Sequence, residues 1–521
     1  LNGITENHRS GKFNNVLVDQ YQGKIRAENT AYPPMLRRNA RFATGSTEDK
    51  RKVIESLRYN SPFHYTTLSF IAGQLEQIGD FATAARYHDL LAANYPLYVD
   101  ARRDALKCRA KAGGRPVTAD EANALIASLA GDEESRERIA WLICWDAGMV
   151  PECLGHLEKW MEMAKPTDYN TFALLARLHR LNGDHAKGDE TLMRFLRTDP
   201  GSMDACEAWL ALSYSKSARG DHDGAVEALR GAQSVDNWKG DVIMRNAFLL
   251  LRSGKHREAA KEYMRSDERY EGSGIGYAVL ALMEIDEEES LLPKLDQALA
   301  KEWPREGSFA AKTALLRKRG DNAGAAAAAE GWNRWMAAEP AAALMAARHH
   351  GIVGDLAKAE YWAEEAVKRT ANKRWEGAYY FAGLIAERQG KLGRARELAG
   401  IIAARDPMNK EGSIILARLA LRAGDVDGAL RELRTPLLLD MPDAHTAAAE
   451  AWLAKGDPQR AYDHAKIAMT DRYFDNWTAP VVMARAASAL GRTEEAKVAA
   501  DICRSFGPDT EPARQIKELN L

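Results

Sequence analysis

The sequence "LRAGDVDGALREL", residues Leu421 to Leu433, places a Gly-Asp pair between two stretches of helix-forming residues. Glycine readily ends a helix in a left-handed conformation, and aspartate is a favoured first residue for the helix that follows. The stretch therefore predicts a helix, a tight turn and a second helix. Nearly the same break recurs along the whole chain, so the question is what repeats with it.

Glycines equivalent to Gly424 recur at intervals of 32 to 37 residues, apart from one interval of 66. The long interval is a double one and predicts a degenerate break near Asp286 to Glu289. Aspartate directly follows seven of the glycines, as expected where a new helix begins. The glycines are Gly79, Gly114, Gly148, Gly183, Gly220, Gly254, Gly320, Gly354, Gly390, Gly424, Gly456 and Gly491.

Small residues accompany these glycines at fixed distances. Five residues after each glycine the residue is small, as at Gly188 and Ala429, and seven residues before it small residues dominate, as at Ala417. One small position on each helix lets an antiparallel pair pack at the close end of the usual range. A proline 17 or 18 residues after several glycines, such as Pro407, predicts the end of the second helix.

This pattern resembles the tetratricopeptide repeat family, which has a unit of about 34 residues with small residues at the helix contact, a turn glycine and a late proline. The resemblance covers roughly residues 61–508, and "LIAERQGKLGRARELAGIIAARDP" (Leu384 to Pro407) is a good match. It implies an all-α fold, a right-handed superhelical solenoid of about thirteen tetratricopeptide-like helical hairpins. Trp141 departs from the pattern, because it stands where the family has a small residue.

The ends of the chain predict a capped solenoid. Residues 46–60 predict an N-terminal capping helix, residues 61–508 the solenoid, and residues 509–521 a C-terminal capping helix. Residues 1–45 are polar and rich in Asn and Gln, and they predict an irregular arm that lies on the solenoid or reaches a partner. The alternative for this segment is an unpacked tail.

Composition narrows the class of protein. The 521 residues are 46% hydrophobic and 28% charged, which suits a folded chain, and the net charge of −2 gives no reason to expect a nucleic-acid partner. No apolar run is long enough to cross a bilayer. The absence of an initiator Met slightly favours a processed, periplasmic protein over a cytoplasmic one, but the compartment stays unknown.

Signatures of an enzyme or a cofactor site are not found. The five cysteines form no CxxC pair, so neither a zinc ribbon nor a disulfide framework is indicated. There is no P-loop, no H-E-x-x-H and no G-x-S-x-G motif. The adjacent His349 and His350 would point about 100° apart on a helix and are expected at the surface or in the groove. The sequence therefore predicts a non-catalytic protein with no metal and no cofactor.

Arginines recur on the first helix of each repeat, which lines the concave groove in the family that the chain resembles. A ladder of guanidinium groups there could bind an acidic peptide or an anionic glycan. The alternative is that the arginines are solvated, or paired with Glu76, Asp146, Glu387 and Glu450. The candidate binding residues are Arg177, Arg180, Arg252, Arg317, Arg348, Arg388, Arg418, Arg422 and Arg485.

Tryptophan is also frequent, with twelve in the chain. Most are expected to pack between repeats, although some could be exposed anchors for a partner or stacking surfaces for sugar rings. The Asn and Lys set with which chaperone-binding members of the family grip a terminal carboxylate is not recognisable, which disfavours a cochaperone. The tryptophans clustered in sequence are Trp332, Trp335, Trp362 and Trp375.

The predicted function is a scaffold or adaptor that binds one or more proteins through the groove and the N-terminal arm, within a larger assembly. The Ala- and Arg-rich style of the sequence indicates a bacterial protein. The alternative is a periplasmic repeat protein that guides an anionic polysaccharide during export. Binding of a glycan through arginines would weaken sharply with ionic strength, whereas an apolar protein interface would not.

Overall fold

The structure, a computed structural model, describes residues 54, 64–96, 98–129, 131–199, 201–269, 274–301, 305–370, 377–438, 441–469 and 477–521. These residues form 27 α-helices and one short 3-10 helix, and no strand occurs among them. The all-α prediction is confirmed. The predicted arm over 1–45 and, apart from Ile54, the predicted capping helix over 46–60 lie outside the described residues.

The chain divides into two compact units, Leu1–Ala147 and Gly148–Leu521. The continuity of the predicted solenoid across this division stays a prediction, and each unit is described by itself. The described helices of the first unit are α5 (Tyr65–Gln77), α6 (Phe81–Asn94), α7 (Asp100–Ala112), α8 (Ala119–Ala127) and α9 (Glu133–Asp146).

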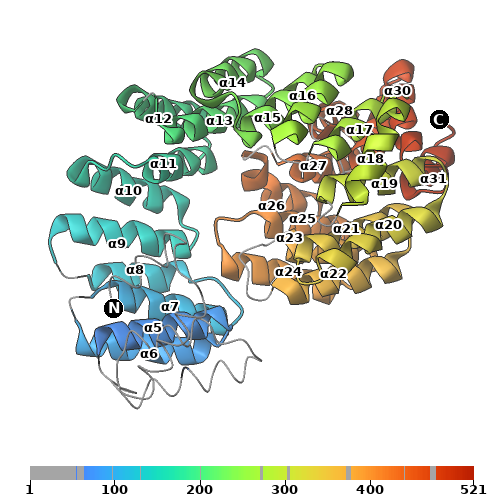
Figure 1. The fold of residues 1–521 in the computed structure, drawn as a ribbon. Coiled ribbons are helices and arrows are strands. Elements are labelled where there is room, and N and C mark those ends of the chain that lie inside the picture. Colours follow the sequence, from blue (N-terminus) through green and yellow to red (C-terminus); the bar gives the residue numbers. More distant parts are fainter. Residues whose placement is uncertain are drawn as a thin grey trace, which may run out of the picture. The chain divides into compact units, whose positions relative to one another are not determined.

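In the second unit, consecutive helices lie side by side as hairpins (Figure 1). Its helices are α10 (Val150–Ala164), α11 (Tyr169–Leu181), α12 (His185–Thr198), α13 (Met203–Ala218), α14 (His222–Asp236), α15 (Gly240–Arg252), α16 (His256–Arg269), α17 (Ile275–Met283), η1 (Glu288–Leu291), α18 (Leu292–Leu299), α19 (Glu306–Lys318), α20 (Asn322–Trp335), α21 (Pro340–Val353), α22 (Leu356–Thr370), α23 (Gly377–Arg388), α24 (Leu392–Arg405), α25 (Glu411–Arg422), α26 (Val426–Leu438), α27 (Pro442–Ala454), α28 (Pro458–Ala468), α29 (Thr478–Ala489), α30 (Thr493–Ser505) and α31 (Glu511–Glu518).

The turn inside each hairpin is a left-handed glycine. All twelve predicted glycines have a positive φ, from 63° at Gly114 to 87° at Gly183. In the degenerate unit the same conformation is taken by Asp286, with φ 55°, three residues after the end of α17. The helix–turn–helix repeat and the position of its degenerate break are therefore confirmed.

The aspartate after the glycine caps the second helix. The Asp425 carboxylate accepts a hydrogen bond of 2.7 Å from the backbone N–H of Gly428, and Asp184 accepts one of 3.0 Å from Lys187. Each bond satisfies an amide that the helix itself leaves without an acceptor and contributes about 1 kcal/mol. The Gly-Asp pair thus ends one helix and begins the next.

The small residues let the two helices of a hairpin touch closely. A Cβ atom added to Gly188 would lie 2.9 Å from the carbonyl oxygen of Ala176, which is closer than carbon and oxygen can approach. These residues stand five positions after and seven before the turn glycine Gly183. Ala417 and Ala429 hold the same two positions around Gly424, and both are fully buried.

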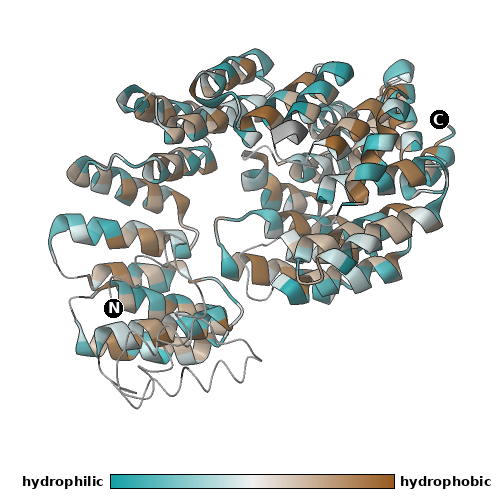
Figure 2. Ribbon diagram, in the orientation of Figure 1, coloured by the Kyte–Doolittle hydropathy of each residue, from teal (hydrophilic) through white to brown (hydrophobic). Residues whose placement is uncertain are grey.

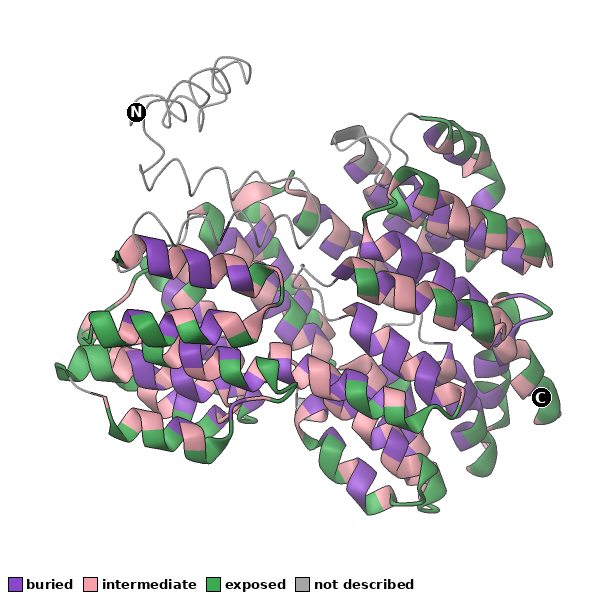
Figure 3. Cartoon of the chain, turned by 90° about the horizontal axis from the view of Figure 1, so that it is seen from below, coloured by how far each residue is buried: buried purple, intermediate pink, exposed green. Residues whose placement is uncertain are grey.

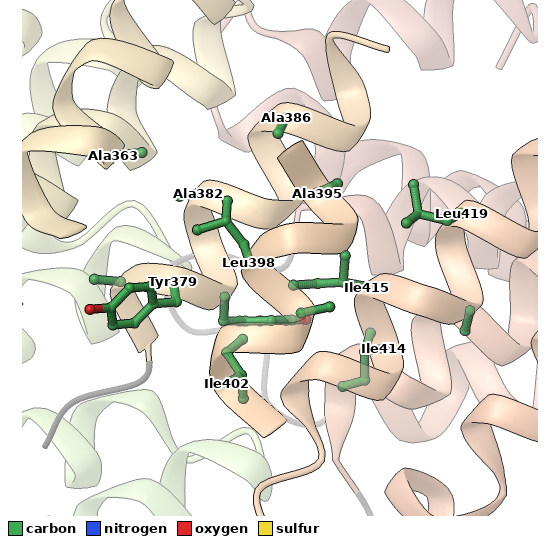
Figure 4. Packing of buried hydrophobic residues seen from close by; sticks show 14 of the residues in the cluster. Ala363, Tyr379, Ala382, Ala386, Ala395, Leu398, Ile402, Ile414, Ile415 and Leu419 are labelled. Carbon is green, nitrogen blue, oxygen red and sulfur yellow. The ribbon is translucent and has the colours of Figure 1, made fainter. Parts of the chain in front are cut away.

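The hydrophobic core of the second unit continues from one hairpin to the next. One cluster joins Ala363 on α22, Tyr379 on α23, Leu398 on α24 and Ile415 on α25 (Figure 4). Most helices carry both hydrophobic and hydrophilic residues (Figure 2), and they present both buried and exposed residues (Figure 3). No described helix combines the length and the hydrophobicity that crossing a bilayer requires.

Hairpins far apart in the sequence also meet within the second unit. Arg177 donates a hydrogen bond of 3.4 Å to the carbonyl of Met408, and Arg317 donates one of 2.8 Å to the carbonyl of Phe506. Helix α31 lies within the predicted C-terminal capping segment, 509–521. It packs against α29 and α30 with Ile516 buried, and it also contacts α21.

The burial of two histidines differs from what the sequence predicts. His349 and His350 are each only 2% exposed, so the expectation that they lie at the surface or in the groove is wrong. His350 Nε2 lies 2.8 Å from Glu330 Oε1, and burial lowers the pKa of His349 to about 3. The α21 helix is buried on most of its sides, which a single apolar stripe in the sequence would not indicate.

The turn glycines give a direct test with a matched control in one hairpin. A Cβ added at Gly390 or at Gly393 meets no atom within 4 Å, but only Gly390 has a positive φ, of 75°. Gly390→Ala is expected to lower the free energy of unfolding by about 1–2 kcal/mol because of backbone strain. Gly393→Ala is expected to leave it unchanged or to raise it by up to about 1 kcal/mol. Urea unfolding followed by circular dichroism measures both, and equal effects would contradict this account of the turn.

Candidate functional site

A cavity of about 370 Å³ opens on the first helices of successive hairpins. Helices α21, α23, α25, α27 and α29 each open a hairpin, and each contacts the next one directly. All five contribute to the wall of the cavity, with Trp477 just before α29. We call the surface of these five helices the A-helix face and the cavity the A-helix pocket.

Three of the nine predicted arginines line this pocket, namely Arg348 from α21, Arg388 from α23 and Arg418 from α25. Each stands on the first helix of its hairpin, as the sequence predicts. They are partly buried, and burial lowers the pKa of Arg388, with the charge of Arg418 adding to the effect and that of Glu511 opposing it. A negative group in the pocket would offset that cost.

Much of the pocket lining is apolar, including Phe381, Leu384, Ile385 and Trp477. The guanidinium of Arg388 lies 4.6 Å from the ring centroid of Trp477, within the range of a cation–π interaction. The pocket thus places positive charge next to an aromatic and aliphatic surface.

A buried carboxylate, Glu387, holds the guanidinium of Arg418, which lines the pocket. Glu387 is 2% exposed and accepts hydrogen bonds from Arg418, at 3.2 Å, and from Arg422. Arg418 also donates to Glu450 at 3.0 Å. Burial raises the pKa of Glu387, but the two arginines outweigh it and lower the pKa overall. Arg418 and Arg422 are therefore held in place by carboxylates.

A tyrosine and an aspartate form a second polar pair in the wall. The Tyr380 hydroxyl donates a hydrogen bond of 2.8 Å to Asp443. Burial raises the pKa of Asp443, although the hydrogen bond and the charges of Arg418 and Arg348 act in the opposite direction. Burial and the Asp443 charge raise the pKa of Tyr380 well above its usual value. The pair adds a hydroxyl and a carboxylate beside the arginines.

The remaining predicted arginines lie away from the pocket. Arg177 and Arg317 bind the backbone carbonyls described above, and Arg252 donates to the Ser217 hydroxyl at 2.5 Å. Arg180 is half-buried beneath Gly188, and Arg485 is exposed. Five of the nine therefore line no part of the pocket, and neither does Arg422, which binds Glu387.

The alternative that carboxylates pair with the arginines is partly realised. Glu387 and Glu450 bind Arg418, as that alternative anticipates. Glu76 instead lies 2.9 Å from His88, and Asp146 accepts a hydrogen bond of 2.6 Å from Arg103.

Several pocket residues were not predicted from the sequence, although the repeat carries a signal for them. Glu411 and Asp443 each lie 13 residues before the turn glycine of their own hairpin. Tyr380 and Thr446 each lie 10 residues before it, and Arg348 and Arg418 lie 6 before. These offsets fall on one side of a helix. Aligning every first helix on its glycine would have identified the lining positions.

The clustered tryptophans do not form a common surface. Trp332 is buried, Trp362 packs on the core cluster, and Trp335 is 47% exposed, while Trp375 lies outside the described residues. The tryptophan that lines the pocket is Trp477, which stands apart from them in the sequence.

Comparisons with known proteins return only distant likenesses. No protein-family model and no curated protein matches the chain. Among solved structures, the chain is similar to the Cut9–Hcn1 hetero-tetramer of APC/C, at 14% identity over 91% of this chain and 93% of that one, with a TM-score of 0.34. It is similar to yeast Tom70 at 14% identity over 87% and 94%, with a TM-score of 0.35. It is similar to Naa15/Naa10 bound to HypK-THB at 18% identity over 91% and 80%, with a TM-score of 0.29.

These scores are too low to carry an argument, so the class of protein rests on the chain's own hairpins. They repeat at intervals near 34 residues, turn at a left-handed glycine and pack through small residues. The described chain is an all-α helical-hairpin repeat protein, and its unit resembles the tetratricopeptide repeat.

The buried carboxylate gives a prediction with a sign in pH. Glu387→Gln is expected to lower the free energy of unfolding at pH 7 by about 3 kcal/mol, because it removes the charge that two guanidiniums face. The Glu387 pKa is lowered from its ordinary 4.5 in the folded state, so its stabilisation is present above pH 4.5 and is lost as the pH falls through the lowered value. The difference in the free energy of unfolding between the parent protein and Glu387→Gln is therefore expected to become smaller as the pH falls.

Glu364→Gln is the matched control. Glu364 pairs with Arg394 at 2.8 Å, but both side chains are about 30% exposed, so its loss is expected to cost about 1 kcal/mol or less. Urea unfolding of the three proteins at pH 7 and pH 3.5 makes the comparison. A cost at Glu387 no larger than at Glu364 would show that the buried cluster is not stabilising.

Proposed function

We propose that this protein is a non-catalytic scaffold or adaptor that binds a segment of a protein partner along the A-helix face, within a larger, bacterial assembly. The observation that carries the proposal is the A-helix pocket, in which Arg348 and Arg388 stand beside the wall of Phe381 and Trp477. An extended repeat surface of this kind can bind a partner through many weak contacts and a few residues that contribute most of the binding energy.

The residues of the pocket wall indicate which side chains of the partner would bind there. A guanidinium binds a carboxylate through two parallel hydrogen bonds, and an aromatic wall favours an aliphatic or aromatic side chain. The preferred segment therefore carries an Asp or Glu close to a large apolar residue. Tyr380 and Asp443 add a hydroxyl and a carboxylate that can bind the backbone amides of such a segment.

The lining residues support binding rather than catalysis. No cysteine, histidine, lysine or serine stands among the described residues of the pocket wall. The wall thus lacks the usual pairing of a nucleophile with a histidine base.

The segment over 1–45 is proposed as a second contact with the partner.

A peptide selection tests the proposal. The full chain is used to select linear peptides from a random display library, and the selected peptides are measured by fluorescence anisotropy. Arg348→Ala and Arg388→Ala are each expected to weaken binding about tenfold or more, equivalent to about 1.4 kcal/mol. Arg265→Ala is the control, because Arg265 also stacks on a tryptophan, 4.4 Å from the ring centroid of Trp238, but lies outside the pocket.

Three results would decide the matter. Acidic and apolar peptides that lose affinity only in the two pocket variants would support the scaffold. Peptides that bind all the variants equally would remove the pocket from the proposal. No peptide selected, together with salt-sensitive binding of a polyuronate, would favour the alternative of a protein that guides an anionic polysaccharide. Deletion of residues 1–45 tests the arm in the same assay.

A further inference from the structure

Three side chains with metal-binding chemistry converge in the first unit. Glu76 comes from the end of α5, His88 from the middle of α6 and Cys108 from α7. Each offers one ligand atom, and these three atoms all lie within 4.8 Å of one another. His88 Nε2 lies 2.9 Å from Glu76 Oε1.

Two of the three side chains are buried, and Glu76 is partly exposed. Cys108 is fully buried in a core cluster with Ile71 and Leu75, and His88 is 5% exposed. The second ring nitrogen of His88, Nδ1, is buried without a hydrogen-bond partner among the described residues. In the described part of the chain, His179 and His256 also have a buried ring nitrogen without a hydrogen-bond partner, so this feature alone does not mark a site. What distinguishes His88 is the convergence of its imidazole with a carboxylate and a thiol.

We propose that Glu76, His88 and Cys108 bind one Zn²⁺ ion. Zinc accepts thiolate, imidazole and carboxylate ligands together, at about 2.0–2.3 Å in a tetrahedral arrangement. Ligand atoms in such a site lie about 3.3–3.8 Å apart, so side-chain shifts of under about 1 Å would close the site from its present spacing. Three protein ligands leave the fourth position for water or for another side chain.

The ligand types select among metals. Magnesium and calcium take oxygen ligands and do not favour a thiolate, while copper(I) favours thiolate and thioether sulfur over a carboxylate. One sulfur, one nitrogen and one oxygen ligand are the combination that zinc accepts most readily of these ions. Cobalt(II) accepts the same ligands and reports on them through its absorption.

The charges around the cluster set the conditions for binding. Burial and the charge of Glu76 raise the pKa of Cys108 to about 12, although Lys107 and Lys111 act in the opposite direction. Zinc binds cysteine as the thiolate, so binding forms a zinc–sulfur bond and the thiol proton leaves to solvent. Asp104 lies one helical turn before Cys108, and its carboxylate interacts with both His88 and Glu76. Its negative charge opposes that of the two lysines at Cys108.

The site is independent of the proposed scaffold function, since the ligands lie in the first unit and the A-helix pocket in the second. Zinc would join the first hairpin to the helix that follows it, because α5, α6 and α7 each supply a ligand. Its expected effect is to raise the thermal stability of that part of the chain.

Titration of the full chain with metal tests the proposal. The protein is stripped with a chelator, dialysed and titrated with Zn²⁺ in competition with a coloured chelator, and separately with Co²⁺. One tight equivalent per chain is expected, and cobalt should give thiolate-to-metal charge transfer in the near ultraviolet. Cys108→Ser should abolish that absorption, and His88→Gln should weaken zinc binding at least about tenfold.

Cys503→Ser is the matched control, because Cys503 is equally buried with a pKa also raised to about 12, yet it belongs to no such cluster among the described residues. It should keep both the stoichiometry and the absorption of the parent protein. Absence of charge transfer in the parent would overturn the proposal, as would its persistence in Cys108→Ser. If Cys108→Ser fails to fold, X-ray absorption of the cobalt-loaded parent decides, since it detects one sulfur ligand or none.

Discussion

The structure depends on one backbone constraint, the left-handed turn that separates the two helices of every hairpin. A glycine adopts this conformation without the steric cost that a Cβ atom brings, and the aspartate that often follows caps the next helix. The turn reverses the chain within a few residues. Small residues on both helices then let the pair pack at close range, as the contact between Gly188 and the Ala176 carbonyl shows. Where glycine is replaced, at Asp286, the backbone keeps the same sign of φ, so the conformation and not the residue type is the conserved feature of the repeat.

A nearly constant hairpin length brings equivalent positions of successive first helices together. Arg418 on α25 reaches Glu387 on the preceding first helix and Glu450 on the following one. Such a network places a carboxylate with 2% exposure between guanidiniums, which is acceptable only because the opposite charges are in direct contact. The same register gathers Arg348, Arg388 and Trp477 around one cavity. A pocket of this kind belongs to no single hairpin, since its walls come from five first helices.

The glutamate, histidine and cysteine cluster arises differently. Its three residues come from helices that follow one another directly, and Cys108 lies in the hydrophobic cluster that these helices share. Buried polar groups are costly unless they are paired, and His88 uses only one of its ring nitrogens in a contact with protein. A hairpin repeat can therefore bring functional side chains together in two ways. The pocket gathers them from successive first helices, and the glutamate, histidine and cysteine cluster gathers them where neighbouring helices pack together.

The sequence by itself determined the fold class, the helix–turn–helix unit, the twelve turn glycines and the degenerate break, because each depends on local backbone preferences and short-range spacing. It also pointed to three arginines of the pocket, Arg348 and Arg418 at six residues before the turn glycine and Arg388 at two residues before it. It did not identify Tyr380, Asp443 or Trp477 as their neighbours, and it predicted exposure for the buried His349 and His350. Those features depend on which hairpins meet, such as α23 with the residue that precedes α29. Only the tertiary structure decided them, because the angle between successive hairpins accumulates over many repeats and no local pattern fixes its sum.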